Sequence, residues 1–204
     1  MAATDWLSQG TLVLASNNKG KIAEFEKLFA ELQLPVEVVA QGKLNIEDAI
    51  EDGLSFVENA IIKARHASKI SGKPAIADDS GLVIDVLGGL PGVHSARFAE
   101  NDEKRIEKVL NTLQYEKYEN RAAKFVCVMV IVSPEGETLH SCTGTCEGYI
   151  IDKPVGEHGF GYDPIFYIPE LNATMAQLSM EEKNKISHRA KALRCMLDWL
   201  KSAN

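Results

Sequence analysis

The sequence predicts an α/β fold, in which buried strands and helices alternate along the chain. An apolar run, Thr11 to Ala15, leads through a polar loop into a segment whose apolar residues recur at helical spacing. A second apolar run, Pro74 to Ala77, follows another helical segment and ends in two carboxylates. Two longer strand-like runs, Ala122 to Ser133 and Thr138 to Ile150, flank a short turn and are typical of an antiparallel hairpin.

Length and composition indicate an ordinary globular protein. The chain has 204 residues, of which 45% are hydrophobic, and this is enough for a continuous core. No repeat or flexible linker divides it, so we expect residues 1–204 to form a single domain, built as two lobes that share one sheet. The net charge of −7 argues against a nucleic-acid polymer as partner, although a local basic cleft could take a small polyanion.

The apolar segments and the cysteines favour a cytoplasmic location. The longest apolar run, Phe125 to Val132, is far shorter than the ~18 residues that a membrane span needs. The first residues lack the basic and apolar regions of a signal peptide. The cysteines show no C-x-x-C spacing, and the two on one predicted strand would lie ~13 Å apart. We therefore expect free thiols at Cys127, Cys142, Cys146 and Cys195.

The loop after the first strand has the composition of an anion site. It is small, polar and doubly basic, and it runs directly into a helix with apolar residues from Ile22 onward. Free backbone N–H groups and the helix dipole then point to the same place as the lysines, which suits phosphate. A plain helix N-cap with two solvated lysines explains the same pattern. The loop comprises Ser16, Asn17, Asn18, Lys19, Gly20 and Lys21.

An acidic connector and a helix lead toward the second apolar run. The helix is expected to begin at Ser55 and to place Ala60, Ala64 and Ala67 on one face. Most of its charged residues form a solvated face, but Lys63 lies where an ammonium group could meet phosphate. The acids of the connector are Glu47, Asp48, Glu51 and Asp52.

Asp78 and Asp79 end the second apolar run and form the centre of the predicted site. A buried strand that delivers carboxylates to the rim of a sheet brings them to the edge where ligands of α/β folds bind. Adjacent carboxylates are costly to hold together unless a cation neutralises them, and oxygen-only ligands suit Mg²⁺ or Mn²⁺. We therefore predict a metal-assisted site. The alternative is a solvated turn at residues 78–81, because Asp, Ser and Gly are common turn residues.

Two later segments have the composition of a ligand site. The loop 156–166 surrounds Phe160 and Tyr162 with glycines, which suits either a ring laid against a flat ligand or rings that anchor the loop to the core. The last helix is expected to begin at Ser187, so that His188 and Arg189 lie in its first turn. The helix dipole disfavours cations there, which indicates a nearby anionic or acceptor-rich ligand; the alternative is a pair of cations at the protein surface, which costs little.

One set of motifs comprises five ordered blocks: residues 16–21, 56–65, 77–82, 159–164 and 187–189. This set resembles the noncanonical purine nucleoside triphosphate pyrophosphatases, the inosine/xanthosine triphosphatase or Ham1-like family. The resemblance implies a two-lobed α/β fold with a long mixed central sheet, flanking helices and a cleft between the lobes. It also implies a homodimer and Mg²⁺-dependent cleavage of a nucleoside triphosphate to the monophosphate and pyrophosphate.

The resemblance implies roles for individual residues. Asp79 would be the general base and a metal ligand. Glu51 would be the second metal ligand, although the other connector acids lie close by. Residues 16–21 would bind the triphosphate with help from Lys63, and His94 stands where many relatives have tyrosine, so it receives no role. The other nucleotide contacts would be Ser80, Phe160, Gly161, Tyr162, Asp163, Lys183, His188 and Arg189.

Taken together, these residues predict selective hydrolysis of ITP, dITP and XTP. A donor aimed at position 6 pairs with the oxo group of hypoxanthine or xanthine but not with the amino group of adenine. A cationic donor at position 2, for which Arg189 is the candidate, disfavours guanine. Two other classes fit part of the pattern: another metal phosphohydrolase, which would release orthophosphate, and a nucleotide-sensing module without turnover. Assaying pyrophosphate against orthophosphate, with and without Mg²⁺, separates all three.

Overall fold

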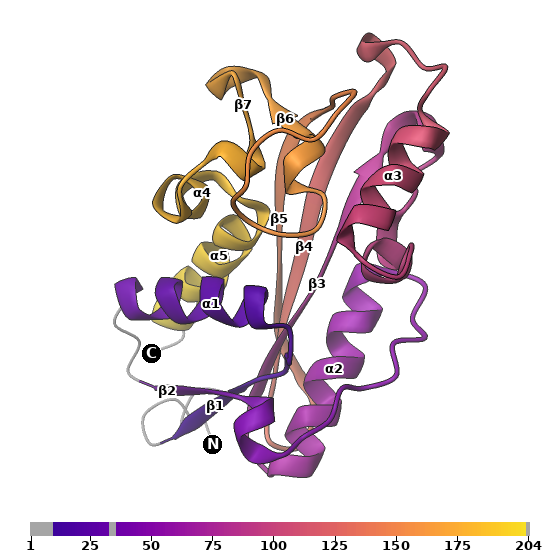
Figure 1. Cartoon of the computed structure of the whole chain (residues 1–204). Coiled ribbons are helices and arrows are strands. Elements are labelled where there is room, and N and C mark those ends of the chain that lie inside the picture. The colour runs from indigo at the N-terminus through magenta and orange to yellow at the C-terminus, as the bar shows by residue number, and fades with distance from the viewer. Residues whose placement is uncertain (1–9, 33–35, 203–204) are drawn as a thin grey trace. The chain divides into compact units, whose positions relative to one another are not determined.

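The protein is built on one mixed, seven-stranded sheet with flanking helices (Figure 1), as a computed structural model that describes residues 10–32 and 36–202 shows. The strand order is β2-β1-β3-β4-β5-β6-β7. Both β2 and β3 run parallel to β1, whereas β6 is antiparallel to β5 and β7. The predicted α/β class with a mixed central sheet is therefore confirmed.

The bounds of the elements follow the sequence pattern closely. The strands are β1 (Thr11–Leu14), β2 (Glu37–Ala40), β3 (Ala75–Ile84), β4 (Ala122–Val132), β5 (Thr138–Ile150), β6 (Phe166–Ile168) and β7 (Ala173–Thr174). The α-helices are α1 (Lys19–Leu32), α2 (Phe56–Ser71), α3 (Asp102–Thr112), α4 (Met180–Ile186) and α5 (His188–Ser202). Neighbouring β4 and β5 are joined by a short turn at residues 133–137, as the hairpin prediction requires.

Backbone contacts divide the chain into two compact units. Unit 1 comprises residues 1–79, 127–144 and 190–204, of which the structure describes 10–32, 36–79, 127–144 and 190–202. Unit 2 comprises residues 80–126 and 145–189. Because β3, β4 and β5 each give residues to both units, the predicted site residues also divide between the units. The cleft implied by the family resemblance stays a prediction.

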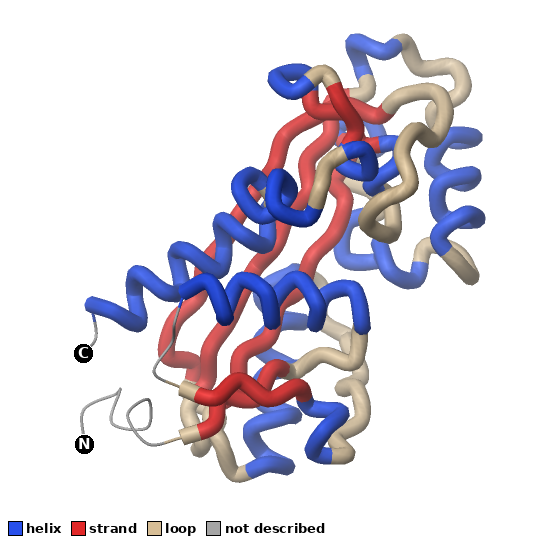
Figure 2. Tube along the Cα trace, turned by 60° about the vertical axis from the view of Figure 1, so that its left-hand side comes forward, coloured by secondary structure: helices blue, strands red, loops and turns tan. Residues whose placement is uncertain are grey.

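In unit 1, helices pack on both faces of the strands. Leu12, Leu14 and Ile76 belong to one buried cluster with Phe25 of α1 and with apolar residues of α5. The neighbours of these residues along each strand point to the other face of the sheet, because side chains alternate. That face meets α2, whose Ala60, Ala64 and Ala67 are completely buried. Accordingly, Figure 2 shows α1 and α2 on opposite sides of these strands.

In unit 2, one core joins α3 to the distal parts of β3, β4 and β5. Ile106 and Val109 of α3 are buried together with Leu113, which follows the helix directly, and they share this core with Leu82 and Ile84 of β3. Ile106, Val109 and Leu113 are three to four positions apart and therefore lie on one face of the helix, which explains why they are buried together.

Strand β3 does not end at the two carboxylates, so the prediction that they lie at the rim of the sheet is wrong. The strand runs on through residues 78–81 to Ile84. A solvated turn at these residues is excluded for the same reason. Because side chains alternate along a strand, Asp78 and Asp79 point to opposite faces of the sheet. The two carboxylates therefore meet different lysines, although they remain close enough for their charges to act on each other.

The expectation of four free thiols is wrong for two of the cysteines. Cys142 of β5 and Cys195 of α5 form a disulfide, with Cα atoms 6.0 Å apart. These residues are 53 positions apart in sequence, so local spacing could not pair them. Cys127 and Cys146 are buried and lie outside the disulfide. Among the described helices, none has the length and apolar character needed to cross a membrane.

Candidate active site

The basic loop that precedes α1 is both a helix cap and a source of a buried charge. Asn18 Oδ1 accepts a hydrogen bond from Lys21 N at 3.1 Å, and Ser16 Oγ accepts one from Asn18 N at 3.2 Å. The capping interpretation is therefore confirmed. Lys21 is not solvated, however, because its Nζ lies 2.9 Å from Asp78 Oδ2 and its side chain is 15% exposed. Lys19 is exposed at the start of the helix.

A second lysine joins Asp79 to the acidic connector. Lys63 Nζ of α2 lies 3.4 Å from Glu51 Oε2 and 3.7 Å from Asp79 Oδ1. The partners of the two aspartates follow the alternation of β3: Asp78 faces α1, and Asp79 faces α2. Together with Lys21, these residues form what we call the charge cluster of unit 1. It contains three carboxylates and two ammonium groups.

Electrostatics make the charge cluster a favourable place for a further cation. Burial alone would lower the pKa of Lys63, but the charges of Asp78, Asp79 and Glu51 outweigh this effect and raise the pKa above its usual value. Burial also raises the pKa of Asp79, and the nearby lysines offset this only in part. The raised pKa of Lys63 reflects the negative charge of the carboxylates around it, and that charge also attracts other cations. Oxygen donors with one unbalanced negative charge fit a hard divalent cation such as Mg²⁺.

Asn59 of α2 positions Asp79 and was not predicted from the sequence. Its Nδ2 donates to Asp79 Oδ2 at 3.2 Å, and its Oδ1 accepts from Gly53 N at 2.9 Å. The side chain is completely buried beside Ala60, and it links the catalytic candidate to the connector that carries Glu51. A Cβ added at Gly53 would lie 2.6 Å from Asn59 Oδ1, so this contact requires glycine. The sequence did contain a signal for this role, because Asn59 is a polar residue on the alanine face of the expected helix.

Of the four connector acids, Glu51 is the one whose carboxylate meets Lys63. The carboxylate of Asp48 instead accepts hydrogen bonds from Asn17 and Gln41, which ties the connector to the basic loop. Glu47 contributes its main-chain carbonyl to His66. The geometry therefore favours Glu51 over its neighbours as a partner of Asp79, while its role as a metal ligand stays a prediction.

In unit 2, a buried ion pair supports the aromatic loop. Asp163 Oδ2 lies 2.8 Å from Lys183 Nζ and also accepts from Phe160 N at 3.1 Å. A Cβ at Gly159 would collide with this carboxylate, and Gly159 has φ +77°. Lys183 Nζ and the Arg189 guanidinium lie 4.9 and 5.1 Å from the centre of the Phe160 ring. Phe160 is thus held as a half-buried ring with cations over it.

His188 and Arg189 begin α5, as predicted, and both are buried. The His188 imidazole stacks on Phe125, with ring centres 4.9 Å apart and an angle of 15° between the planes. Phe125 in turn packs against Phe166 at 4.4 Å. The position of the imidazole is therefore set by two aromatic rings of the unit 2 core.

Tyr162 anchors the aromatic loop. Its side chain is 5% exposed, and its hydroxyl donates to Ser95 O at 2.8 Å. Burial raises the pKa of this phenol, so it stays protonated as a donor. Gly161 N also donates to Asp102 Oδ2 at 2.7 Å. Of the two interpretations of this loop, anchoring to the core therefore holds for Tyr162, and Phe160 is the ring that stays partly accessible.

Known proteins match almost the whole chain. The model of the Ham1 family matches residues 12–199. The chain belongs to the Ham1 family. A "dITP/XTP pyrophosphatase" of Acinetobacter baylyi is 61% identical over 95% of both chains, and one of Photorhabdus laumondii is 50% identical over 94% of this chain and 98% of its own. The Ham1 protein structure from Coxiella burnetii is 44% identical and superposes with a TM-score of 0.86 over 95% of this chain and 100% of its own.

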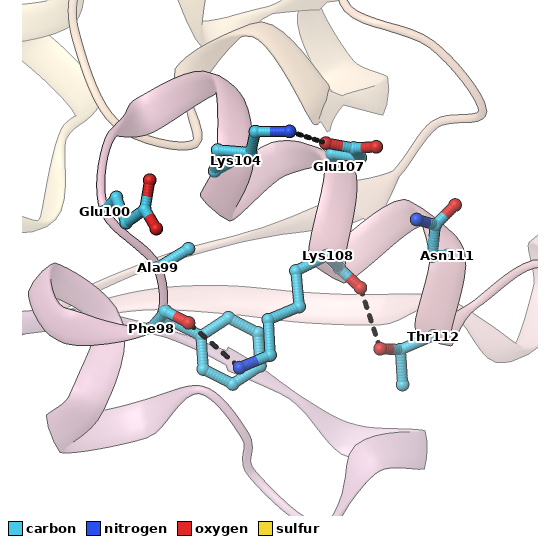
Figure 3. A pocket seen from close by; sticks show the side chains of 8 residues that line it. All are labelled: Phe98, Ala99, Glu100, Lys104, Glu107, Lys108, Asn111 and Thr112. Carbon is cyan, nitrogen blue, oxygen red and sulfur yellow. Dashed lines mark hydrogen bonds and ion pairs between the residues drawn. The ribbon is translucent and has the colours of Figure 1, made fainter.

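Two hollows of the Ham1-family chain lie on α3, and no predicted site residue lines either of them. One, of about 690 Å³, lies between Phe98 and Thr112 (Figure 3). Its cations already have partners: Lys108 donates to Phe98 O and lies over that ring, and Lys104 pairs with Glu107. The other, of about 820 Å³, shares Glu107 and Asn111 of α3 with the first and is also lined by Arg121 and Asp152. We assign the candidate site to the polar clusters instead.

The role of Asn59 in this Ham1-family chain predicts a loss of stability on substitution. In Asn59→Leu the volume is nearly kept, but Gly53 N and Asp79 Oδ2 lose a buried partner, which costs ~1–3 kcal/mol. Urea denaturation measures the change. Val57→Ala, on an exposed part of the same helix, should change stability by less than ~0.5 kcal/mol. Equal stability of Asn59→Leu and wild type would show that the hydrogen bonds of Asn59 do not hold Gly53 and Asp79 in place.

Proposed function

We propose that this chain hydrolyses ITP, dITP and XTP to the nucleoside monophosphate and pyrophosphate, and so removes noncanonical purine nucleotides from the nucleotide pool. The observation that carries this proposal is the 61% identity, over 95% of both chains, with a protein named dITP/XTP pyrophosphatase. The charge cluster of unit 1 supplies chemistry that suits phosphates, and the aromatic loop of unit 2 supplies chemistry that suits a purine base.

The phosphate end of the substrate suits the start of α1. Lys19 is exposed there, and the first turn of the helix contains no acidic residue to compete with an anion. The N-terminal N–H groups and the helix dipole favour negative charge at the same point. Lys21 and Lys63 add positive charge, and the substrate phosphates would compete with Asp78 and Asp79 for them.

The hydrolytic step requires a carboxylate that can take a proton from water. Asp79 suits this role because burial raises its pKa and because Asn59 holds its Oδ2. Asp79 and Glu51 would hold Mg²⁺, which supplies neutralisation of charge on the phosphates when bound. The water attacks the α-phosphorus, its proton passes to Asp79, and pyrophosphate leaves with its charge balanced in part by the lysines.

The base end suits the aromatic loop and the start of α5. Phe160 is half-buried and can lie against a purine ring, while His188 and Arg189 are donors held by aromatic neighbours. A guanidinium donates but cannot accept, so it tolerates the oxygen of xanthine at position 2 and opposes the amino group of guanine. The Asp163–Lys183 pair is buried, which supports a role in holding Phe160 in place.

Three further properties complete the proposal and follow from the family resemblance. The enzyme would depend on Mg²⁺, act as a homodimer and work in the cytoplasm. The oxygen donors of the charge cluster support the first of these. The net charge of −7 supports a small nucleotide rather than a nucleic-acid polymer as the ligand.

Replacing the proposed base should remove activity without unfolding the protein. Asp79→Asn keeps the shape of the side chain but cannot accept the proton, so we expect the turnover of ITP to fall ~10²–10⁴-fold. Release of pyrophosphate and of orthophosphate is measured separately. Asp52→Asn, an exposed acid of the same connector, is the matched control and should keep the wild-type rate. Retention of more than about a tenth of the rate in Asp79→Asn would exclude Asp79 as the base.

Arg189 should contribute to base selectivity. Removing a donor that opposes the guanine amino group should lower the ratio of kcat/KM for ITP over GTP by ~5–150-fold, the effect of one mismatched buried donor. The ratio is measured for wild type, Arg189→Gln and Arg189→Lys, and Arg194→Ala, at an exposed position of α5, is the control. If Arg189→Gln loses rate but keeps the wild-type ratio, Arg189 positions the base and another group discriminates at position 2.

A further inference from the structure

A cluster of metal-binding side chains lies in unit 1, apart from the candidate active site. It contains His140 and Cys142 of β5 and Cys195 of α5. One ligand atom from each residue lies within 4.8 Å of those of the other two. We call these three residues the thiol–imidazole cluster. The resemblance to the Ham1 family gives none of them a role, and neither does the proposed hydrolysis.

The spacing of these residues on their elements explains why they meet. His140 and Cys142 are two positions apart on a strand and therefore project from one face. Cys195 and Trp199 are four positions apart on a helix and also share a face. Cys142 is bonded to Cys195, and the His140 ring stacks on Trp199 with centres 4.7 Å apart and an angle of 4° between planes. Two adjacent contacts thus hold β5 and α5 together at this point.

The two cysteines form a disulfide in the structure, so a metal requires the reduced state. A dithiol reductant converts the disulfide to two thiols by transfer of two electrons and two protons, and is itself oxidised to a disulfide. The two thiolates and one imidazole then form a ligand set that Zn²⁺ prefers. Binding of Zn²⁺ by the two thiols releases two protons.

We propose that the reduced protein binds one Zn²⁺ through His140, Cys142 and Cys195. In a tetrahedral site, two sulfurs at ~2.3 Å from zinc lie ~3.8 Å apart. A Cα separation of 6.0 Å permits this with small side-chain rotations. The Trp199 ring holds the imidazole in place, and Cys195 is exposed, which gives the ion a path of entry. Water completes the coordination.

The metal and the disulfide use the same two sulfurs and therefore exclude each other. A zinc ion bound to both thiolates shields them from oxidants, and oxidation of the cysteines releases the ion. The link between β5 and α5 is kept in both states, because either a covalent bond or a metal bridges the same two residues. The reduced cluster thus offers zinc three protein ligands and leaves one coordination position to water.

Titration of the full-length reduced protein with Co²⁺ tests the proposal, because Co²⁺ reports thiolate ligands by a charge-transfer absorption that oxygen ligands do not give. Excess Mg²⁺ keeps Co²⁺ away from the carboxylates of the charge cluster. We expect one equivalent of Co²⁺ to produce the absorption and one equivalent of Zn²⁺ to abolish it. The oxidised protein should show no such absorption.

Variants at two positions of the cluster and at one cysteine outside it make the result specific. Cys195→Ser should abolish the absorption, and His140→Asn should weaken Co²⁺ binding by at least ~10-fold. Cys146→Ser, outside the cluster, should bind as wild type does. Absence of the absorption in the reduced wild type, or its persistence in Cys195→Ser, would overturn the proposal. Circular dichroism and ITP turnover of each variant show that the fold and the active site are unchanged.

Discussion

The contact between Lys63 and the carboxylates of Glu51 and Asp79 determines how the candidate active site is assembled. Lys63 stands on α2, Glu51 on the connector and Asp79 on β3, so one ammonium group joins three parts of the chain. With Lys21 and Asp78, the cluster still has one more negative than positive charge. Burial of unbalanced charge is costly, and this imbalance is the reason to expect a metal ion there.

The geometry of β3 gives the two aspartates different partners. Alternation along the strand turns Asp78 toward Lys21 on α1 and Asp79 toward Asn59 and Lys63 on α2. The basic loop is thereby tied to one face of the strand and the connector to the other. Asp78 holds Lys21, which we propose binds phosphate, whereas Asp79 is the residue that we propose takes the proton.

Much of the fold could be predicted because local signals were strong. Ser55 caps α2 at the point where this helix was expected to begin, and Ala60, Ala64 and Ala67 are buried on one face of it. The remaining features depend on contacts between distant residues. Nothing in the sequence near Cys142 specifies Cys195 as its partner, and nothing near Asn59 specifies Gly53 and Asp79 together. The strand beyond Asp79 was missed because Asp, Ser and Gly favour turns in isolation.

We propose that Mg²⁺ binds at the charge cluster and balances its excess negative charge. Thermal unfolding of the protein without nucleotide tests this most directly. A cation that binds only the folded state at one hundred times its Kd stabilises it by ~2.7 kcal/mol. Wild type should therefore gain Tm as Mg²⁺ is added, and Asp52→Asn should gain as much. Asp79→Asn should lose most of this gain. An equal rise of Tm in wild type and Asp79→Asn would contradict a metal site at Asp79.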